Sequence, residues 1–283
     1  MDHTGAGHRG PDGLTLVTFA VATTLGASNF IAVRFSNREL PPFWGAGLRF
    51  GLAAALFVAI CLALRLRRPR GGDLLLTAVY GALAFALSYA LMYWALVRVT
   101  AGMATIVLAV VPLMTLLLAA AQGSERLSPR SAAGALLALA GIAWMTLGPG
   151  AAAVPLDALA AMAAAALAIA QSVILGKRLS GNHPAMTNAV GMTTGAVLLL
   201  GLSLAAGEAW AVPSGRSTLL ALGYLVTFGS AGLFVLVLLV VRRWTASASS
   251  YMFVLFPVVT LALGALLAGE PVTRDAVLGA VLV

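Results

Sequence analysis

The chain has 283 residues, of which 61% are hydrophobic and only 9% are charged, and its mean hydropathy is +1.01. This composition leaves too little polar surface to cover a water-soluble globule, so soluble classes of protein are excluded. The formal net charge of +8 comes from short basic clusters between apolar runs, without the continuous stripe typical of nucleic-acid binding. The single cysteine, Cys61, excludes an intramolecular disulfide and a cysteine-based metal cluster. We therefore expect a lipid bilayer, and no nucleic acid, as partner.

Apolar runs of about twenty residues recur along the whole chain, and each can cross ~30 Å of hydrocarbon as a helix. The first run is longer than a signal-peptide core and lacks a small-residue cleavage site, so we expect it to remain as a span. The last run stops after nine residues, and we expect the natural chain to continue beyond it. In chain order the runs are 14–33, 43–64, 74–97, 100–121, 131–148, 157–175, 185–206, 218–241, 246–268 and 275–283.

Basic residues in the short loops predict the orientation, because they are enriched on the cytoplasmic side of the membrane. A cytoplasmic N-terminus places eleven lysines and arginines in the cytoplasm and five on the other side, with Arg49 set aside because it lies inside a span. We therefore expect a multi-pass protein of the cell membrane with its N-terminus in the cytoplasm.

The two halves of the chain repeat each other. A shift of 145 residues lays 98–138 over 243–283 without a gap and pairs identical residues such as Thr100 with Thr245 and Pro112 with Pro257. A shift of 143 pairs Arg34 with Lys177 in a weaker match of the first spans. Because each repeat has five spans, the second copy enters the membrane with the opposite orientation. We expect an all-α membrane protein of ten helices in two inverted repeats, 1–148 and 157–283.

Several segments resemble EamA-type members of the drug/metabolite transporter superfamily, and the resemblance covers essentially the whole chain. The segments are Gly26 to Arg34, Leu40 to Phe43, Leu48 to Phe50, Tyr93 to Leu96, Thr100 to Ala104, Pro112, Glu125 to Ser128, Gly134 to Gly141, Ala246 to Pro257 and Glu270.

The resemblance implies a central cavity, cytoplasmic termini and export of amino acids or related metabolites. One departure concerns the first helix, where the family often has tryptophan and this chain has Gly26. The chain also looks somewhat like the aromatic amino-acid exporters, because Tyr89 matches a cavity tyrosine of their third helix. The tryptophan of their sixth helix falls near Ala168, which weakens that likeness.

Polar side chains inside spans are costly in hydrocarbon and point to a pathway or to helix contacts. Under the repeat shift, Ser28 and Asn29 fall opposite Gln171 and Ser172, which favours a cavity over isolated helix-helix hydrogen bonds. The candidate cavity residues are Ser28, Asn29, Arg49, Tyr89, Tyr93, Thr105, Gln171, Ser172, Tyr224 and Tyr251.

Other readings of these residues remain open. Tyr93 lies near the end of its span, where interfacial anchoring competes with a place in the cavity. Arg49 lies about two turns inside its helix and needs a partner, which is either a substrate carboxylate, backbone carbonyls or the headgroup layer. Pro112 and Pro257 predict kinks that serve as hinges or as static bends. Glu125 and Glu270 favour turn and capping roles.

Energy coupling is predicted from the positions of the carboxylates, all of which lie in loops or at helix ends. The spans thus hold no carboxylate for a proton relay, and Gly176-Lys177 is no Walker A motif because Arg178 follows it. No metal site, cofactor or enzyme constellation is expected. We expect a monomer or weak homodimer that carries a small-molecule substrate facilitatively or by exchange. The alternatives are a drug or nucleobase efflux carrier with proton antiport, and a membrane scaffold without transport.

Overall fold

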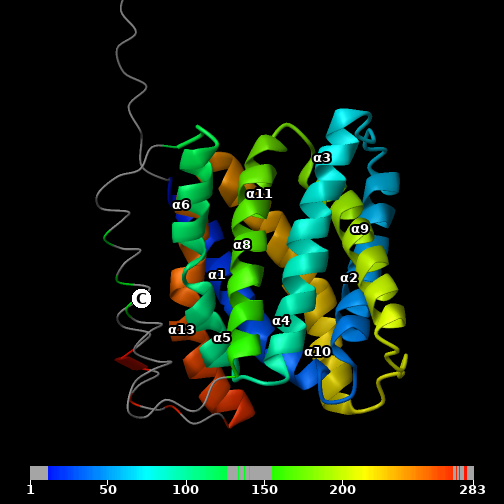
Figure 1. The fold of residues 1–283 in the computed structure, drawn as a ribbon. Helices are drawn as coiled ribbons and strands as arrows, with labels where there is room; N and C mark the ends of the chain where they lie inside the picture. The colour runs from blue at the N-terminus through cyan, green and yellow to red at the C-terminus, as the bar shows by residue number, and fades with distance from the viewer. Residues whose placement is uncertain are drawn as a thin grey trace, which may run out of the picture.

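The computed structural model describes residues 12–125 and 155–269, with isolated positions 133, 137, 140, 272, 274, 277 and 278. This part of the chain is all helical, and its helices stand side by side in one bundle (Figure 1). The helices, with η marking a π-helix, are α1 (Gly13–Ser36), α2 (Pro42–Ala63), α3 (Gly72–Gly81), η1 (Ala82–Leu87), α4 (Ser88–Leu96), α5 (Ala101–Leu108), α6 (Val111–Ala121), α8 (Leu156–Arg178), α9 (Pro184–Ala205), α10 (Arg216–Val226), η2 (Thr227–Gly232), α11 (Leu233–Arg243), α12 (Ala246–Ser250), α13 (Met252–Leu263) and η3 (Gly264–Ala268).

Eight helical stretches are long and apolar enough to cross a bilayer, and they match eight of the ten expected runs to within a few residues. Four of these stretches lie in the first half of the chain. One stretch can contain several helical segments, and Gly72–Leu96, for example, combines α3, η1 and α4. The expected runs 131–148 and 275–283 lie outside the described residues, apart from isolated positions. Large apolar side chains such as Leu62 and Val197 remain more than 60% exposed, as expected for helices that face lipid. The chain is an integral membrane protein.

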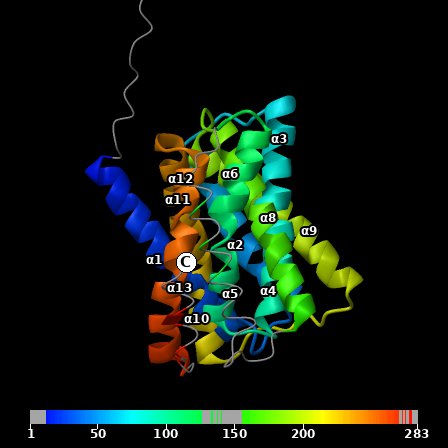
Figure 2. The ribbon, with the colours of Figure 1, turned by 60° about the vertical axis from the view of Figure 1, so that its left-hand side comes forward.

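The loops gather at two ends of the bundle. The end where α1 begins and α2, α8 and α11 finish is named the basic end and lies at the top of Figure 1. Figure 2 shows α1 crossing the bundle obliquely, with its first residues toward this end. The other end is named the opposite end. The described basic residues at the basic end are Arg65, Arg67, Arg68, Arg70, Lys177, Arg178, Arg242 and Arg243, and those of the opposite-end loops are Arg34, Arg38, Arg98 and Arg216.

Local irregularities recur at the spacing of the sequence repeat. The π-helices at 82–87 and 227–232 are separated by 145 residues. Thr100 caps α5 by accepting a hydrogen bond from the Met103 N–H at 3.3 Å, and Thr245 caps α12 by accepting one from the Ala248 N–H at 3.1 Å. An N-cap hydroxyl satisfies a backbone donor that has no partner within the helix. The repeated threonine therefore explains why these helices begin at matching positions.

The two halves of the chain pack most closely where α9 meets α2 and η1 (Figure 1). Gly81 lies directly against the backbone of Gly191, so a Cβ on Gly81 would lie 2.6 Å from the Gly191 Cα. One turn further along α9, Gly195 lies against Phe85, which is fully buried. Small residues let the helix backbones approach in this way, and close van der Waals packing drives helix association in lipid.

Candidate substrate cavity

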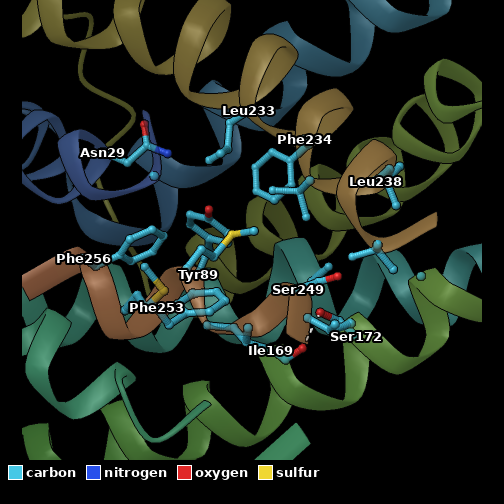
Figure 3. Close-up of a pocket in the computed structure, with 18 of the residues that line it drawn as sticks. Asn29, Tyr89, Ile169, Ser172, Leu233, Phe234, Leu238, Ser249, Phe253 and Phe256 are labelled. Atoms are coloured by element: carbon cyan, nitrogen blue, oxygen red, sulfur yellow. Dashed lines mark hydrogen bonds between the residues drawn. The ribbon is translucent and has the colours of Figure 1, made fainter. Parts of the chain in front are cut away.

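A cavity of about 80 Å³ lies near the centre of the bundle (Figure 3). Liquid water occupies ~30 Å³ per molecule, so the cavity has room for a few water molecules and a larger guest requires its walls to move. The walls come from both halves of the chain. The lining residues are Gly26, Asn29, Phe30, Tyr80, Ala84, Tyr89, Met92, Ile169, Ser172, Val173, Gly176, Leu233, Phe234, Val237, Leu238, Val241, Ser249, Met252, Phe253 and Phe256.

Most of this lining is aliphatic or aromatic, and none of the described lining residues is charged. The Ser172 hydroxyl donates to the Ile169 carbonyl at 2.7 Å, and the Ser249 hydroxyl donates to the Thr245 carbonyl at 2.8 Å. Each hydroxyl therefore donates its proton within its own helix, and only the oxygen lone pairs remain to accept a hydrogen bond from a guest. Such a wall suits an apolar group with few polar contacts.

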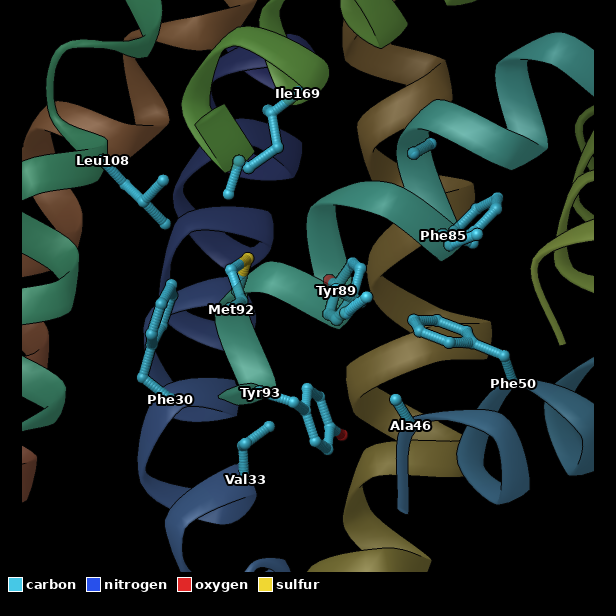
Figure 4. Packing of buried hydrophobic residues seen from close by; sticks show 14 of the residues in the cluster. Phe30, Val33, Ala46, Phe50, Phe85, Tyr89, Met92, Tyr93, Leu108 and Ile169 are labelled. Atoms are coloured by element: carbon cyan, nitrogen blue, oxygen red, sulfur yellow. The ribbon is translucent and has the colours of Figure 1, made fainter. Parts of the chain in front are cut away.

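Asn29 and Tyr89 form the part of the cavity wall that adjoins Gly229 and Arg49, named here the floor. Asn29 is 4% exposed, and its Nδ2 donates to the Gly229 carbonyl at 3.0 Å. Its Oδ1 is buried and has no hydrogen-bond partner among the described residues. The Tyr89 ring meets the Phe50 ring edge-on at 4.7 Å between centroids, and Figure 4 shows it between Phe50 and Met92. The floor separates the cavity from a polar cluster behind it.

Arg49 of α2 is the centre of that polar cluster. Its Nη2 donates to the Gly229 carbonyl at 2.7 Å and its Nε donates to the Ser230 hydroxyl at 2.9 Å. Its Nη1 lies 3.4 Å from the Tyr93 hydroxyl, and its Cζ lies 5.0 Å from the centre of the Tyr89 ring. The π-helix η2 supplies the first two acceptors, and π-helical turns frequently occur at functional sites. Arg49 thus joins the two halves of the chain immediately behind the cavity.

Three of the predicted cavity residues, Asn29, Tyr89 and Ser172, line the cavity. Arg49 and Tyr93 lie behind its floor and are fully buried. Tyr93 is therefore not an interfacial anchor, because its hydroxyl pairs with a buried arginine instead of reaching water.

The other predicted cavity residues are not among the lining residues. The Ser28 hydroxyl donates to the Thr24 carbonyl of its own helix at 2.7 Å, and the Thr105 hydroxyl donates to the Gly102 carbonyl at 2.8 Å. Gln171 accepts a hydrogen bond from Gln122 at 2.8 Å on the outside of α8.

Two further tyrosines of the predicted set lie apart from the cavity. The Tyr224 hydroxyl donates to the Leu25 carbonyl at 3.2 Å, which ties α10 to α1. Tyr251 is 45% exposed where α12 meets α13.

Of the two predicted hinges, Pro112 lies in the first turn of α6, just after a break in the helix, whereas Pro257 lies inside α13, six residues after a break. Ala109 and Val110 separate α5 from α6 ahead of Pro112, and Tyr251 separates α12 from α13 ahead of Pro257. Proline has no N–H to donate to the preceding turn, which weakens the helix there. The breaks are equivalent in kind, although they are not separated by the 145 residues of the repeat.

Sequence reasoning missed the aromatic wall opposite Asn29. A Cβ on Gly26 would lie 2.5 Å from the Phe256 Cζ, so the Phe256 ring occupies the space beside the glycine. Phe256, in α13, lines the cavity beside Gly26. Gly26 is the position of α1 at which the family often has tryptophan. The unusual Gly26 was the available signal, but only the fold shows which ring takes the space. Ser249 was missed as well, because its repeat partner is Ala104 and the shift marks no polar pair.

The described carboxylates lie at the ends of the bundle. Three of them cap helices that are far from them in the sequence. Glu39 caps α10 by accepting from the Ser214 N–H at 2.8 Å and the Gly215 N–H at 3.1 Å, and Glu208 caps α2 by accepting from the Trp44 N–H at 2.7 Å. At the basic end, Glu125 accepts from the backbone and side chain of Ser247 at the start of α12. The capping role expected for Glu125 agrees with this geometry, and Glu270 lies outside the described residues.

The comparisons with known proteins agree with this architecture. The model of the EamA-like transporter family matches residues 13–147 and 157–283. An inner membrane transporter of Escherichia coli named YedA is 30% identical over 90% of this chain and 83% of its own length. A protein of Streptantibioticus cattleyicolor named as a terminal-alkyne amino-acid exporter is 34% identical over 48% of this chain and 44% of its own length.

One solved crystal structure superposes with a TM-score of 0.75 at 20% identity, covering 96% of this chain and 94% of that one, which shows a shared fold. The resemblance noted in the sequence is confirmed. The protein is a multi-pass transporter of the cell membrane rather than an enzyme, and its partners are a small-molecule substrate and the lipid bilayer. The chain belongs to the EamA-like transporter family.

Proposed function

We propose that this transporter exports amino acids or related small metabolites by alternating access of the central cavity. The observation that carries the proposal is a cavity with walls from both halves of the chain, which adjoins the buried Arg49 through Tyr89. Rocking of one half against the other would reverse which end is closed. The cavity lies mainly in the half of the bundle near the basic end, which a cytoplasmic N-terminus would place toward the cytoplasm.

The proposal includes two inverted repeats. The side chains of Arg34 and Lys177, which donate to backbone carbonyls at helix ends, support it. At the opposite end, Arg34 at the end of α1 donates to the Val99 carbonyl just beyond α4 at 2.9 Å. At the basic end, its repeat partner Lys177 at the end of α8 donates to the Val241 and Trp244 carbonyls of the α11 terminus at 2.9 and 2.6 Å. The same interaction at opposite ends is what an axis in the membrane plane would produce.

Facilitated transport or exchange is favoured over proton antiport. The cavity lining holds no described carboxylate, and Glu39, Glu208 and Glu125 are engaged in helix capping at the ends of the bundle. A carboxylate relay would need an acidic side chain that reaches the cavity. Amino acids are the favoured substrates because the exporter of Streptantibioticus cattleyicolor is named for one, and because the apolar cavity suits their side chains.

Counterflow of labelled leucine, phenylalanine and alanine into proteoliposomes, with and without an imposed pH gradient, tests this function. We expect saturable uptake that needs internal unlabelled amino acid and is indifferent to the gradient. Dependence on the gradient would replace facilitated transport with proton antiport. Vesicles that behave like protein-free ones toward amino acids but move nucleobases or amphipathic drugs would reject the substrate class, and no flux of any solute would favour a scaffold.

A pair of alanine variants links the flux to the cavity. Ala84 lines the cavity and is 5% exposed, whereas Ala55 is exposed on the outside of α2. Ala84→Leu should lower counterflow about tenfold because it fills a space of about 80 Å³. Ala55→Leu should leave counterflow unchanged, since its larger side chain extends into lipid. Equal flux through both variants would place the pathway elsewhere.

A further inference from the structure

Arg49 carries a charge that the described protein does not neutralise. The side chain is fully buried, and none of the described Asp or Glu residues forms an ion pair with it. Its guanidinium is held by hydrogen bonds to Gly229, Ser230 and Tyr93, with the Tyr89 hydroxyl as a further neighbour. Burial of a cation inside a membrane span is expensive, so a buried arginine without an acidic partner among the described residues is a candidate site for an anionic group.

Asn29 has an acceptor that lacks a hydrogen-bond partner among the described residues. Its Oδ1 is a buried acceptor without a donor, and the side chain is 4% exposed. Both groups adjoin the same backbone position, because a Cβ on Gly229 would overlap Asn29 Oδ1 and would lie 3.5 Å from Arg49 Nη2. An unpaired acceptor and a buried cation therefore flank Gly229, beside an apolar cavity.

We propose that Arg49 and Asn29 form the site for the charged end of an α-amino acid. This inference rests on the amino-acid transport proposed above. The Arg49 guanidinium binds the α-carboxylate, in the bidentate geometry that guanidinium favours, and Asn29 Oδ1 accepts from the α-ammonium. The substrate side chain then lies in the cavity against Phe234, Leu238 and Phe256.

Access to this site requires the floor to part. Asn29 and Tyr89 stand between the cavity and the guanidinium, whose Cζ is 5.0 Å from the Tyr89 ring centre. A carboxylate that reaches Arg49 competes with the Gly229 carbonyl and the Ser230 hydroxyl for its donors. Substrate binding would thereby weaken the link between α2 and η2, which belong to different halves of the chain.

Three probes that share one side chain test the site in the wild-type protein. Leucine carries both charged groups, leucinamide lacks the carboxylate, and 4-methylpentanoate lacks the ammonium group. We expect unlabelled leucine to compete with labelled leucine in counterflow about tenfold better than either analogue, because each analogue leaves a buried polar group unpaired. Leucine should also raise the Tm of the purified protein more than either analogue does.

Variants assign each group of the substrate to one side chain. Arg49→Gln should remove the preference for leucine over leucinamide, and Asn29→Ala should remove the preference for leucine over 4-methylpentanoate. Arg38→Gln and Asn188→Ala are the matched controls, since neither residue lines the cavity and Asn188 is also fully buried. Both controls should keep both preferences.

The outcomes separate this inference from the function on which it rests. Wild-type protein that moves leucine and leucinamide equally would overturn the site and leave an amino-acid carrier standing. Loss of all flux in Arg49→Gln together with unchanged probe preferences in Asn29→Ala would indicate a structural crosslink and would also overturn the site. Wild-type protein that transports no amino acid would overturn both proposals. The competition in wild-type protein decides the question even if a variant fails to fold.

Discussion

The loop junctions at the two ends of the bundle are built differently. At the opposite end, the loop 37–41 and the loop 206–215 cap each other's helices through Glu39 and Glu208, and Trp44 stacks on Trp210 with 4.5 Å between ring centroids. At the basic end, the loops 64–71 and 179–183 flank an open cleft. Its lining comprises Arg67, Arg68, Pro69, Arg70, Asp73, Asn182, His183 and Met186.

The difference shows how each pair of loops is held in this conformation. Neither α10 nor α2 has a side-chain cap from its own N-cap residue, so each depends on a carboxylate from the other half of the chain. The start of α3 at the basic end also lacks a side-chain cap, and no described hydrogen bond joins the two loops there. Carboxylates therefore join the two loops at the opposite end, whereas at the basic end the polar links between the halves of the chain run from Ser247 to Glu125 and from Arg178 to Gln122.

The largest expected effect comes from breaking the close packing of the two halves between the ends of the bundle. In Gly81→Ala the new Cβ meets the backbone of Gly191, which cannot rotate away, so we expect a loss of about 1–3 kcal/mol in unfolding free energy. Thermal unfolding in detergent measures it. Gly201→Ala is the control, because nothing lies within 4 Å of that Cβ, and it should be neutral or slightly stabilising. Equal Tm values for both variants would contradict the close approach of α3 and α9.

A smaller effect is expected from removing the Glu208 carboxylate, which caps α2 at the opposite end. Glu208→Ala removes the acceptor for the Phe43 and Trp44 N–H groups and should cost about 1 kcal/mol. It should also admit water from the opposite end, which an impermeant thiol reagent detects as faster labelling of Met92→Cys in a Cys61→Ala background. The control is Asp73→Ala in the basic-end cleft, which should leave that labelling unchanged. Unchanged labelling in Glu208→Ala would show that its caps do not hold this end closed.

The smallest effect is expected from the pH dependence of Glu39. Hydrogen bonds from the Gly215 and Ser214 N–H groups and the Thr218 hydroxyl lower the pKa of this carboxyl from 4.5 to about 2. A lowered pKa in the folded state stabilises the protein above pH 4.5, and that contribution is lost as the pH falls from 4.5 to 2. The Tm of the wild type should fall over this range, and Glu39→Gln should flatten the decline. Parallel Tm profiles for the two proteins would show that Glu39 does not contribute.

Much of the candidate site could not be read from the chain order. Ser28 and Asn29 are neighbours in α1 with equal claims to the cavity, but helix rotation sends Ser28 to its own backbone and Asn29 to the floor. Gln171 and Ser172 divide in the same way. Consecutive residues of a helix point about 100° apart, so a polar pair marks the depth of a site and leaves the choice of residue to the packing.

By itself, the sequence determined the membrane class, the position of eight spans and a 145-residue repeat, at whose spacing the structure shows threonine caps and π-helices. These features depend on hydrophobic length and local hydrogen bonding, which short stretches of chain contain. Only the tertiary structure decided that Arg49 meets Gly229, that Phe256 fills the space beside Gly26, and that Glu208 caps α2. Each of these contacts joins residues 164 or more positions apart, and nothing local to either partner specifies the other.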